Sequence, residues 1–169
     1  TAPHYLLLTD RELLKKDADY RMNPPLRTEK DRLAMIEALR DGTIDAIATD
    51  HAPHTPEEKA DFLKAPNGSI GMETSFSASY TALVKTGVLT LPALIERMSV
   101  RPAQILGIEA GVIEAGAPAD VALIDENAVW TVDPDKLHGK SRNTPFKGMT
   151  LHAKVRATVC GGRIVYSEL

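Results

Sequence analysis

Residues 28–50 are predicted to form a helix followed by a short buried strand. Thr28 is a typical helix N-cap, and Asp31 stands three residues later, close to a capping box. Apolar residues then recur at helical spacing up to Gly42, a common helix stop. The run DAIAT (45–49) is compact and apolar, as in a strand covered on both faces. This order of elements predicts an α/β fold, either a barrel or a doubly wound sheet.

Two helices are predicted after a long loop. Residues 51–72 contain three prolines and two glycines, with room for one helical turn. Long loops in folded domains are usually functional or disordered. We expect helices over 73–86 and 91–106, the second broken just before Pro102, which suits the first turn of a new helix.

The pattern of residues changes after Gly107. Short β-rich runs, at 121–124 and 128–132, follow several Gly and Pro residues. The segment 152–168 reads as a hairpin around Gly161 and Gly162. The chain from about residue 108 therefore predicts a small β unit.

Composition narrows the class of protein. The 169 residues include 20 basic and 23 acidic side chains, a net charge of −3, and no basic stripe suggests nucleic acid. No apolar stretch reaches the ~20 residues of a membrane span. The single cysteine, Cys160, excludes an internal disulfide framework and fits the reducing cytoplasm. The chain opens without Met and meets an apolar run almost at once, as a mature protein or a fragment would.

Polar residues of the types used in catalysis and metal binding lie around the predicted strand end. Asp50 follows the apolar run directly, and in α/β barrels the carboxyl ends of strands carry the chemistry. Such a carboxylate binds a metal, acts as a base, or simply caps a loop. His51 and His54 suit either ligation or packing. The Asn23 amide, which donates and accepts at once, suits a ring amide or an ordinary turn.

Taken together, these segments resemble dihydroorotases of the metal-dependent amidohydrolase superfamily. The motif TDHAPH, followed by EEK, begins at Thr49, and NPPLR begins at Asn23. PHYLLLTD is similar to the family's PHHLLLTD, with Tyr5 where His is commoner. GVIEAGAPADVALID and the ending SRNTPFKGMTLHAKVRATVCGGRIVY also resemble the family, so the similarity covers nearly the whole chain.

The resemblance implies an α/β fold, the C-terminal part of a TIM (β/α)₈ barrel followed by a small β-sandwich segment. Residues 1–107 would contain the end of barrel strand 7, strand 8 at 45–50 and the following helices. Residues 108–169 would be the C-terminal part of the sandwich domain. A complete barrel takes about 250 residues, so the resemblance also implies that an N-terminal portion of the barrel lies outside this sequence.

The implied reaction is the reversible cyclisation of N-carbamoyl-L-aspartate to L-dihydroorotate in pyrimidine biosynthesis, with one or two zinc ions. Asp50 would be both zinc ligand and acid/base. The substrate contacts would be Asn23, His54, Asn67 and Gly68; many relatives have an aromatic residue at position 67. His51 would be structural. The resemblance further implies a cytoplasmic homodimer, with aspartate transcarbamoylase as a potential partner.

One departure limits the activity of the chain as given. Family members carry a His-x-His pair and further zinc ligands on earlier barrel strands. The five histidines here form no such pair: His4, His51, His54, His138 and His152. We therefore expect the isolated chain to be an inactive fragment.

Two other functions stay open. The first is a different cyclic amidase, such as an allantoinase or dihydropyrimidinase, although those families differ after the aspartate and at NPPLR. The second is a non-catalytic, dihydroorotase-like scaffold for aspartate transcarbamoylase, against which the retained Asp50, His54 and Asn23 argue.

Overall fold

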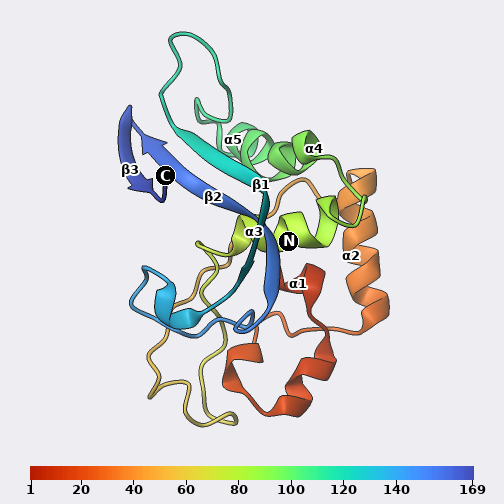
Figure 1. Ribbon diagram of the computed structural model, residues 1–169. Coiled ribbons are helices and arrows are strands. Elements are labelled where there is room, and N and C mark those ends of the chain that lie inside the picture. The colour runs from red at the N-terminus through yellow and green to blue at the C-terminus, as the bar shows by residue number, and fades with distance from the viewer.

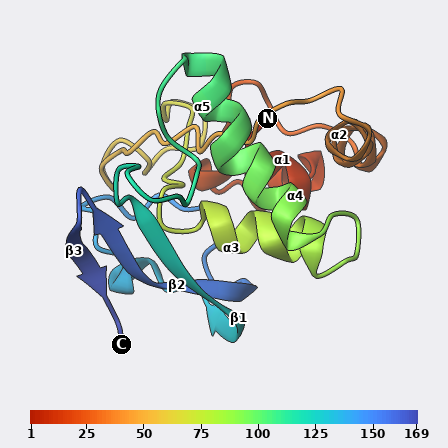
Figure 2. The same cartoon turned by 90° about the horizontal axis from the view of Figure 1, so that it is seen from above.

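The computed structural model describes residues 1–169, with helices lying beside a small antiparallel sheet (Figures 1 and 2). The sheet has three strands in the order β1-β2-β3. In chain order the α-helices and strands are α1 (His4–Leu7), α2 (Glu29–Asp41), α3 (Ser75–Ser79), α4 (Leu91–Ile95), α5 (Arg101–Leu106), β1 (Val121–Thr131), β2 (Thr150–Cys160) and β3 (Arg163–Ser167). Short 3₁₀ turns cover Asp10–Lys15, Ala18–Tyr20 and Pro134–Lys136. No helix is long and apolar enough to cross a bilayer.

Helix α2 begins and ends where the sequence predicts. The Asp31 N–H donates to Thr28 Oγ1 at 3.3 Å, and the Thr28 N–H donates to Asp31 Oδ2 at 3.1 Å. This reciprocal capping box satisfies two backbone donors that the first turn leaves free. At the other end Gly42 has φ 88°, the left-handed conformation that closes many helices.

The predicted strand at 45–50 is not formed, although its middle residue, Ile47, is buried. The Thr1 amino group donates to the Ala46 carbonyl at 2.9 Å, and the Ala48 N–H donates to the Thr1 carbonyl at 2.8 Å. These two bonds flank Ile47 in the pattern of a parallel pair. This is a single pair, which is too short to make a strand.

The predicted helix at 73–86 is confirmed over 75–84, whereas the predicted break before Pro102 is wrong. Residues 91–106 are continuously helical, and the segment Glu96–Val100 has the wider π-helical turn. A second π-helical segment, Tyr80–Val84, follows α3 directly. A wider turn relaxes the i→i−4 pattern that a proline disrupts, so the helix runs through Pro102 without breaking.

The β-rich tail contains one strand where the sequence predicts two. β1 runs from Val121 to Thr131 and so includes the polar residues between the two predicted strands. Its pairing with β2 shifts register between Leu123 and Ile124 and between Asp125 and Val129. Such bulges let a strand bend while it keeps its partner. The predicted β2–β3 hairpin is confirmed, with Gly161 and Gly162 both at positive φ.

Two apolar clusters hold the helices on the sheet, where α3 packs against β2 (Figure 2). The first cluster joins Leu6, Leu39, Ile47, Tyr80, Ala82, Leu83, Leu94 and Ala153. The second joins Leu8, Tyr20, Met22, Leu26, Ala78, Val132, Phe146 and Leu151. Each cluster contains residues from both sides of residue 107. The division into units 1–107 and 108–169 stays a prediction.

Candidate functional site

Asp50 ends the extended segment in an unusual backbone conformation. Its φ is 50°, in the left-handed region that non-glycine residues seldom occupy and that Asp tolerates better than most. Its carboxylate is 52% exposed and accepts no hydrogen bond from the protein. Backbone strain of this kind concentrates at functional sites. The conformation therefore presents a half-exposed carboxylate, with no hydrogen bond from the protein, at the end of the apolar segment.

Asp50 and Asn23 line the same cavity, which has a volume of about 660 Å³. Arg27 and Tyr5 line it as well. The Tyr5 hydroxyl donates to the Pro24 carbonyl at 2.6 Å, which ties α1 to the NPPLR segment. Burial, followed by the negative charge of Asp50, raises the pKa of Tyr5 to about 12, so this hydroxyl stays protonated. The structure thus brings together the carboxylate and the amide that the sequence singles out.

His4 is a buried neighbour of Asp50 that the sequence does not mark as a site residue. Its side chain is 3% exposed, and Nε2 lies 4.0 Å from Asp50 Oδ2 with no hydrogen-bond partner. Burial lowers the pKa of His4 to about 4, although Asp50 acts in the opposite direction and the amino terminus lowers it further. His4 is therefore neutral at pH 7. Its position in PHYLLLTD is the only signal in the sequence that could have found it.

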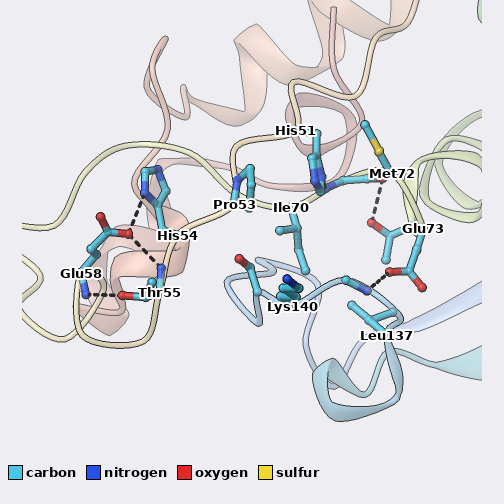
Figure 3. Close-up of a pocket in the computed structure, with 14 residues that line it drawn as sticks. His51, Pro53, His54, Thr55, Glu58, Ile70, Met72, Glu73, Leu137 and Lys140 are labelled. Atoms are coloured by element: carbon cyan, nitrogen blue, oxygen red, sulfur yellow. Dashed lines mark hydrogen bonds and ion pairs between the residues drawn. The ribbon is translucent and has the colours of Figure 1, made fainter.

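His54 lines a different cavity, of about 370 Å³, together with His51 (Figure 3). The His54 ring lies between two polar groups: Nδ1 is 3.3 Å from Glu58 Oε2, and Nε2 is 3.2 Å from the Asn67 carbonyl oxygen. The Thr55 N–H, which donates to Glu58, lowers the pKa of that carboxyl, and His54 contributes to the same shift. Both of these oxygens are acceptors, so a neutral imidazole, which carries one N–H, donates to one of them, and its other nitrogen has no donor within the loop.

Glycines bring the two ends of this loop together. A Cβ on Gly68 would lie 2.5 Å from Ala52 Cβ, and Gly68 has φ 117°. A Cβ on Gly71 would lie 2.7 Å from the Thr49 carbonyl oxygen. Both approaches are closer than a side chain allows, which explains why glycine stands at these positions.

His51 has a structural contact in the same loop. Its Nδ1 accepts a hydrogen bond from the Gly71 N–H at 3.1 Å, and its backbone forms an isolated parallel bridge with Ser69. This contact supports the interpretation of His51 as a structural residue.

The predicted site residues therefore fall into two sets. Asp50 and Asn23 share one cavity, whereas His54 lines the other and its ring contacts the carbonyl of Asn67, which precedes Gly68. No three His, Cys, Asp or Glu side chains of residues 1–169 gather into a group that could hold a metal. The half-exposed carboxylate of Asp50 fits the role of a single metal ligand.

Comparison with known proteins places the chain in a family. The model of the amidohydrolase family matches residues 3–165. The chain belongs to the amidohydrolase family. It is 52% identical to a dihydroorotase from Geobacter metallireducens over 169 residues, and 48% identical to one from Bacillus caldolyticus over 167. These alignments cover 99% and 98% of this chain but 40% and 39% of the relatives.

Solved structures agree with this family. An L-hydantoinase from Arthrobacter aurescens superimposes with a TM-score of 0.93 at 29% identity, over 99% of this chain and 39% of that one. A dihydropyrimidinase from Brevibacillus agri gives a TM-score of 0.92, also at 29% identity, over 99% of this chain and 38% of that one. This amidohydrolase chain thus spans about 40% of the length of the relatives that it matches.

Proposed function

We propose that residues 1–169 act within a dihydroorotase, which interconverts N-carbamoyl-L-aspartate and L-dihydroorotate in pyrimidine biosynthesis. The shared cavity of Asp50 and Asn23 carries the proposal, because it pairs an open carboxylate with an amide suited to a ring amide. The similarity to named dihydroorotases, at 52% identity, is higher than the 29% shared with the hydantoinase structure. This contrast favours dihydroorotate over a hydantoin as substrate.

The proposal includes the architecture of the complete enzyme. Residues 1–107 would end a TIM barrel, with 45–50 as its last strand, and 108–169 would complete a β-sandwich. The parallel pattern of hydrogen bonds around Ile47 supports this placement, since neighbouring barrel strands run parallel. The remaining barrel strands would come from the part of the enzyme that precedes residue 1.

In the hydrolytic direction, water attacks the amide carbon and the ring C–N bond breaks. Zinc, which we propose as the metal, supplies Lewis acidity when bound and lowers the pKa of water to about 7. The Asp50 carboxylate accepts the proton that the attacking water loses. It then delivers this proton to the departing ring nitrogen, so that the proton balance closes. An open carboxylate at the cavity wall suits both steps.

The other residues would bind and orient the substrate. The Asn23 amide would hydrogen-bond to the amide groups of the substrate ring, because it offers both a donor and an acceptor. His54 would contact the substrate carboxylate, and Asn67 and Gly68 would offer polar groups of the loop. These contacts require the cavity of His54 and the cavity of Asp50 to meet in the complete enzyme.

The substrate is tested by comparing cyclic amides in the complete enzyme. We expect kcat/KM for dihydroorotate to exceed that for hydantoin, dihydrouracil and allantoin by at least about 10²-fold, because a site built around a polar substituent rejects analogues that lack it. Ultraviolet absorbance follows the loss of each ring. Faster hydrolysis of any of the other three would show that the enzyme is a different cyclic amidase, and no turnover of any substrate would favour the scaffold.

Variants at His54 and Asn23 test the assignment of substrate contacts. We expect His54→Ala and Asn23→Ala to keep the zinc content of the enzyme while kcat/KM falls, because neither side chain is assigned to the metal. Metal analysis of the purified variants decides the point. Zinc lost from either variant would show that the residue is a ligand.

The cytoplasmic location, the homodimer and the association with aspartate transcarbamoylase that the resemblance implies stay predictions.

A further inference from the structure

Asn143 lies between Pro134–Lys136 and β2 and is only 4% exposed. Its side chain makes three hydrogen bonds to the distant loop 51–72. The Oδ1 atom accepts from the His54 N–H at 3.1 Å. The Nδ2 atom donates to the Ala52 carbonyl at 3.0 Å and to the Gly68 carbonyl at 3.2 Å. A fourth bond joins the backbones, since the Ile70 N–H donates to the Asn143 carbonyl at 3.0 Å.

The chemistry of this contact requires a primary amide. Two carbonyl oxygens need donors and one N–H needs an acceptor, and the asparagine side chain supplies all three from one planar group. An aspartate at position 143 would aim a carboxylate oxygen at two carbonyl oxygens. Because the group is buried, each unpaired or repelled polar atom is costly. Both Nδ2 hydrogens are already used within the protein, so the Asn143 side chain has no donor left for a substrate.

The two segments that Asn143 joins carry the proposed substrate contacts. One contains Ala52 and His54, and the other begins with Gly68. The segments already touch, because the Ala52 N–H donates to the Ser69 carbonyl at 2.8 Å and Gly68 leaves no room for a Cβ. Asn143 bonds both segments from outside the loop, so it sets the position of the His54 backbone relative to the Gly68 carbonyl.

We propose that Asn143 is a positioning residue that fixes the backbone of His54 and Gly68 and thereby sets the affinity for substrate. The inference rests on the proposed function of those two residues. A tether that only stabilises the fold would behave differently. Its loss would lower the fraction of folded enzyme, and with it the apparent kcat, but the folded molecules would keep their normal KM.

The test uses the complete enzyme with Asn143→Asp, and Asn127→Asp as the matched control, because Asn127 is exposed on β1. We expect Asn143→Asp to raise KM for dihydroorotate about tenfold while kcat stays within about twofold and zinc content is unchanged. Asn143→Ser should raise KM in the same direction. Amide hydrogen exchange in substrate-free enzyme should become faster at 52–54 and 68–70 in both Asn143 variants and remain unchanged in Asn127→Asp.

Each outcome decides one question. An unchanged KM in a folded Asn143 variant overturns the proposal, as does failure of both variants to fold, which would assign Asn143 a purely structural role. If the unsubstituted enzyme does not turn over dihydroorotate, the proposed function fails instead. The exchange measurement then still tests whether Asn143 fixes the loop backbone. Unchanged exchange at 52–54 and 68–70 would show that it does not.

Discussion

Asparagine in place of Asp50 is expected to lower kcat of the complete enzyme by about 10²–10⁴-fold through loss of the acid/base alone. An amide cannot accept the proton from the attacking water, so none reaches the leaving nitrogen. It is also a weaker metal ligand than a carboxylate, and we expect zinc content to fall as well. Steady-state hydrolysis of dihydroorotate and metal analysis of the same preparation measure the two effects.

The substitution leaves the backbone undisturbed. Asn tolerates the left-handed region about as well as Asp, so the φ of 50° at this position adds no strain in the variant. Asp10→Asn is a suitable control, because Asp10 is exposed and its carboxylate has no ion pair or hydrogen bond within the protein. A kcat near that of the unsubstituted enzyme in Asp50→Asn would show that Asp50 is neither ligand nor proton carrier.

Short sequence motifs predict the elements that are stabilised by contacts between residues near each other in the chain. The capping box of Thr28 and Asp31 and the left-handed Gly42 depend on residues within a few positions of each other. The hairpin at Gly161 and Gly162 is of the same kind. For this reason α2 and the β2–β3 turn are confirmed nearly to the residue.

Elements that depend on distant partners are predicted less well. The apolar run 45–49 has the composition of a buried strand, but a strand needs a neighbour paired along its length, and the backbone bonds of this run go to single residues, Thr1 and Arg97. Pro102 predicts a break, yet a π-helical turn accommodates it. The bulges of β1 follow from its pairing with β2, which its own residues do not encode.

The candidate site shows the same division. Asp50 stands out because it follows an apolar run within a specific motif, and Asn23 because prolines follow it. His4 and Asn143 do not stand out, because their importance lies in contacts across the fold. Asn143 bonds to His54 across a separation of 89 residues, and His4, in α1, lies 4.0 Å from Asp50 although the two are far apart in the sequence.

Residues 1–169 on their own are expected to show no measurable hydrolysis of dihydroorotate, even with added zinc. A catalytic zinc site generally needs three protein ligands and an open position, and the family pattern assigns only Asp50 to this chain. The chain spans about 40% of the length of its dihydroorotase relatives, which is the second reason for the expectation. The complete enzyme should turn over at an ordinary rate, about 1–10³ s⁻¹.

The experiment compares equal molar amounts of residues 1–169, of the complete enzyme, and of 1–169 mixed with the separately produced preceding part. Apolar side chains that the chain leaves exposed, such as Ile113 at 89% and Leu106 at 70%, would favour association if the other part buries them. Activity that returns only on mixing would show that the missing ligands lie in the preceding part. Turnover at an enzymatic rate from homogeneous 1–169 would instead mean that this chain builds its own metal site, and that the role assigned to Asp50 alone is wrong.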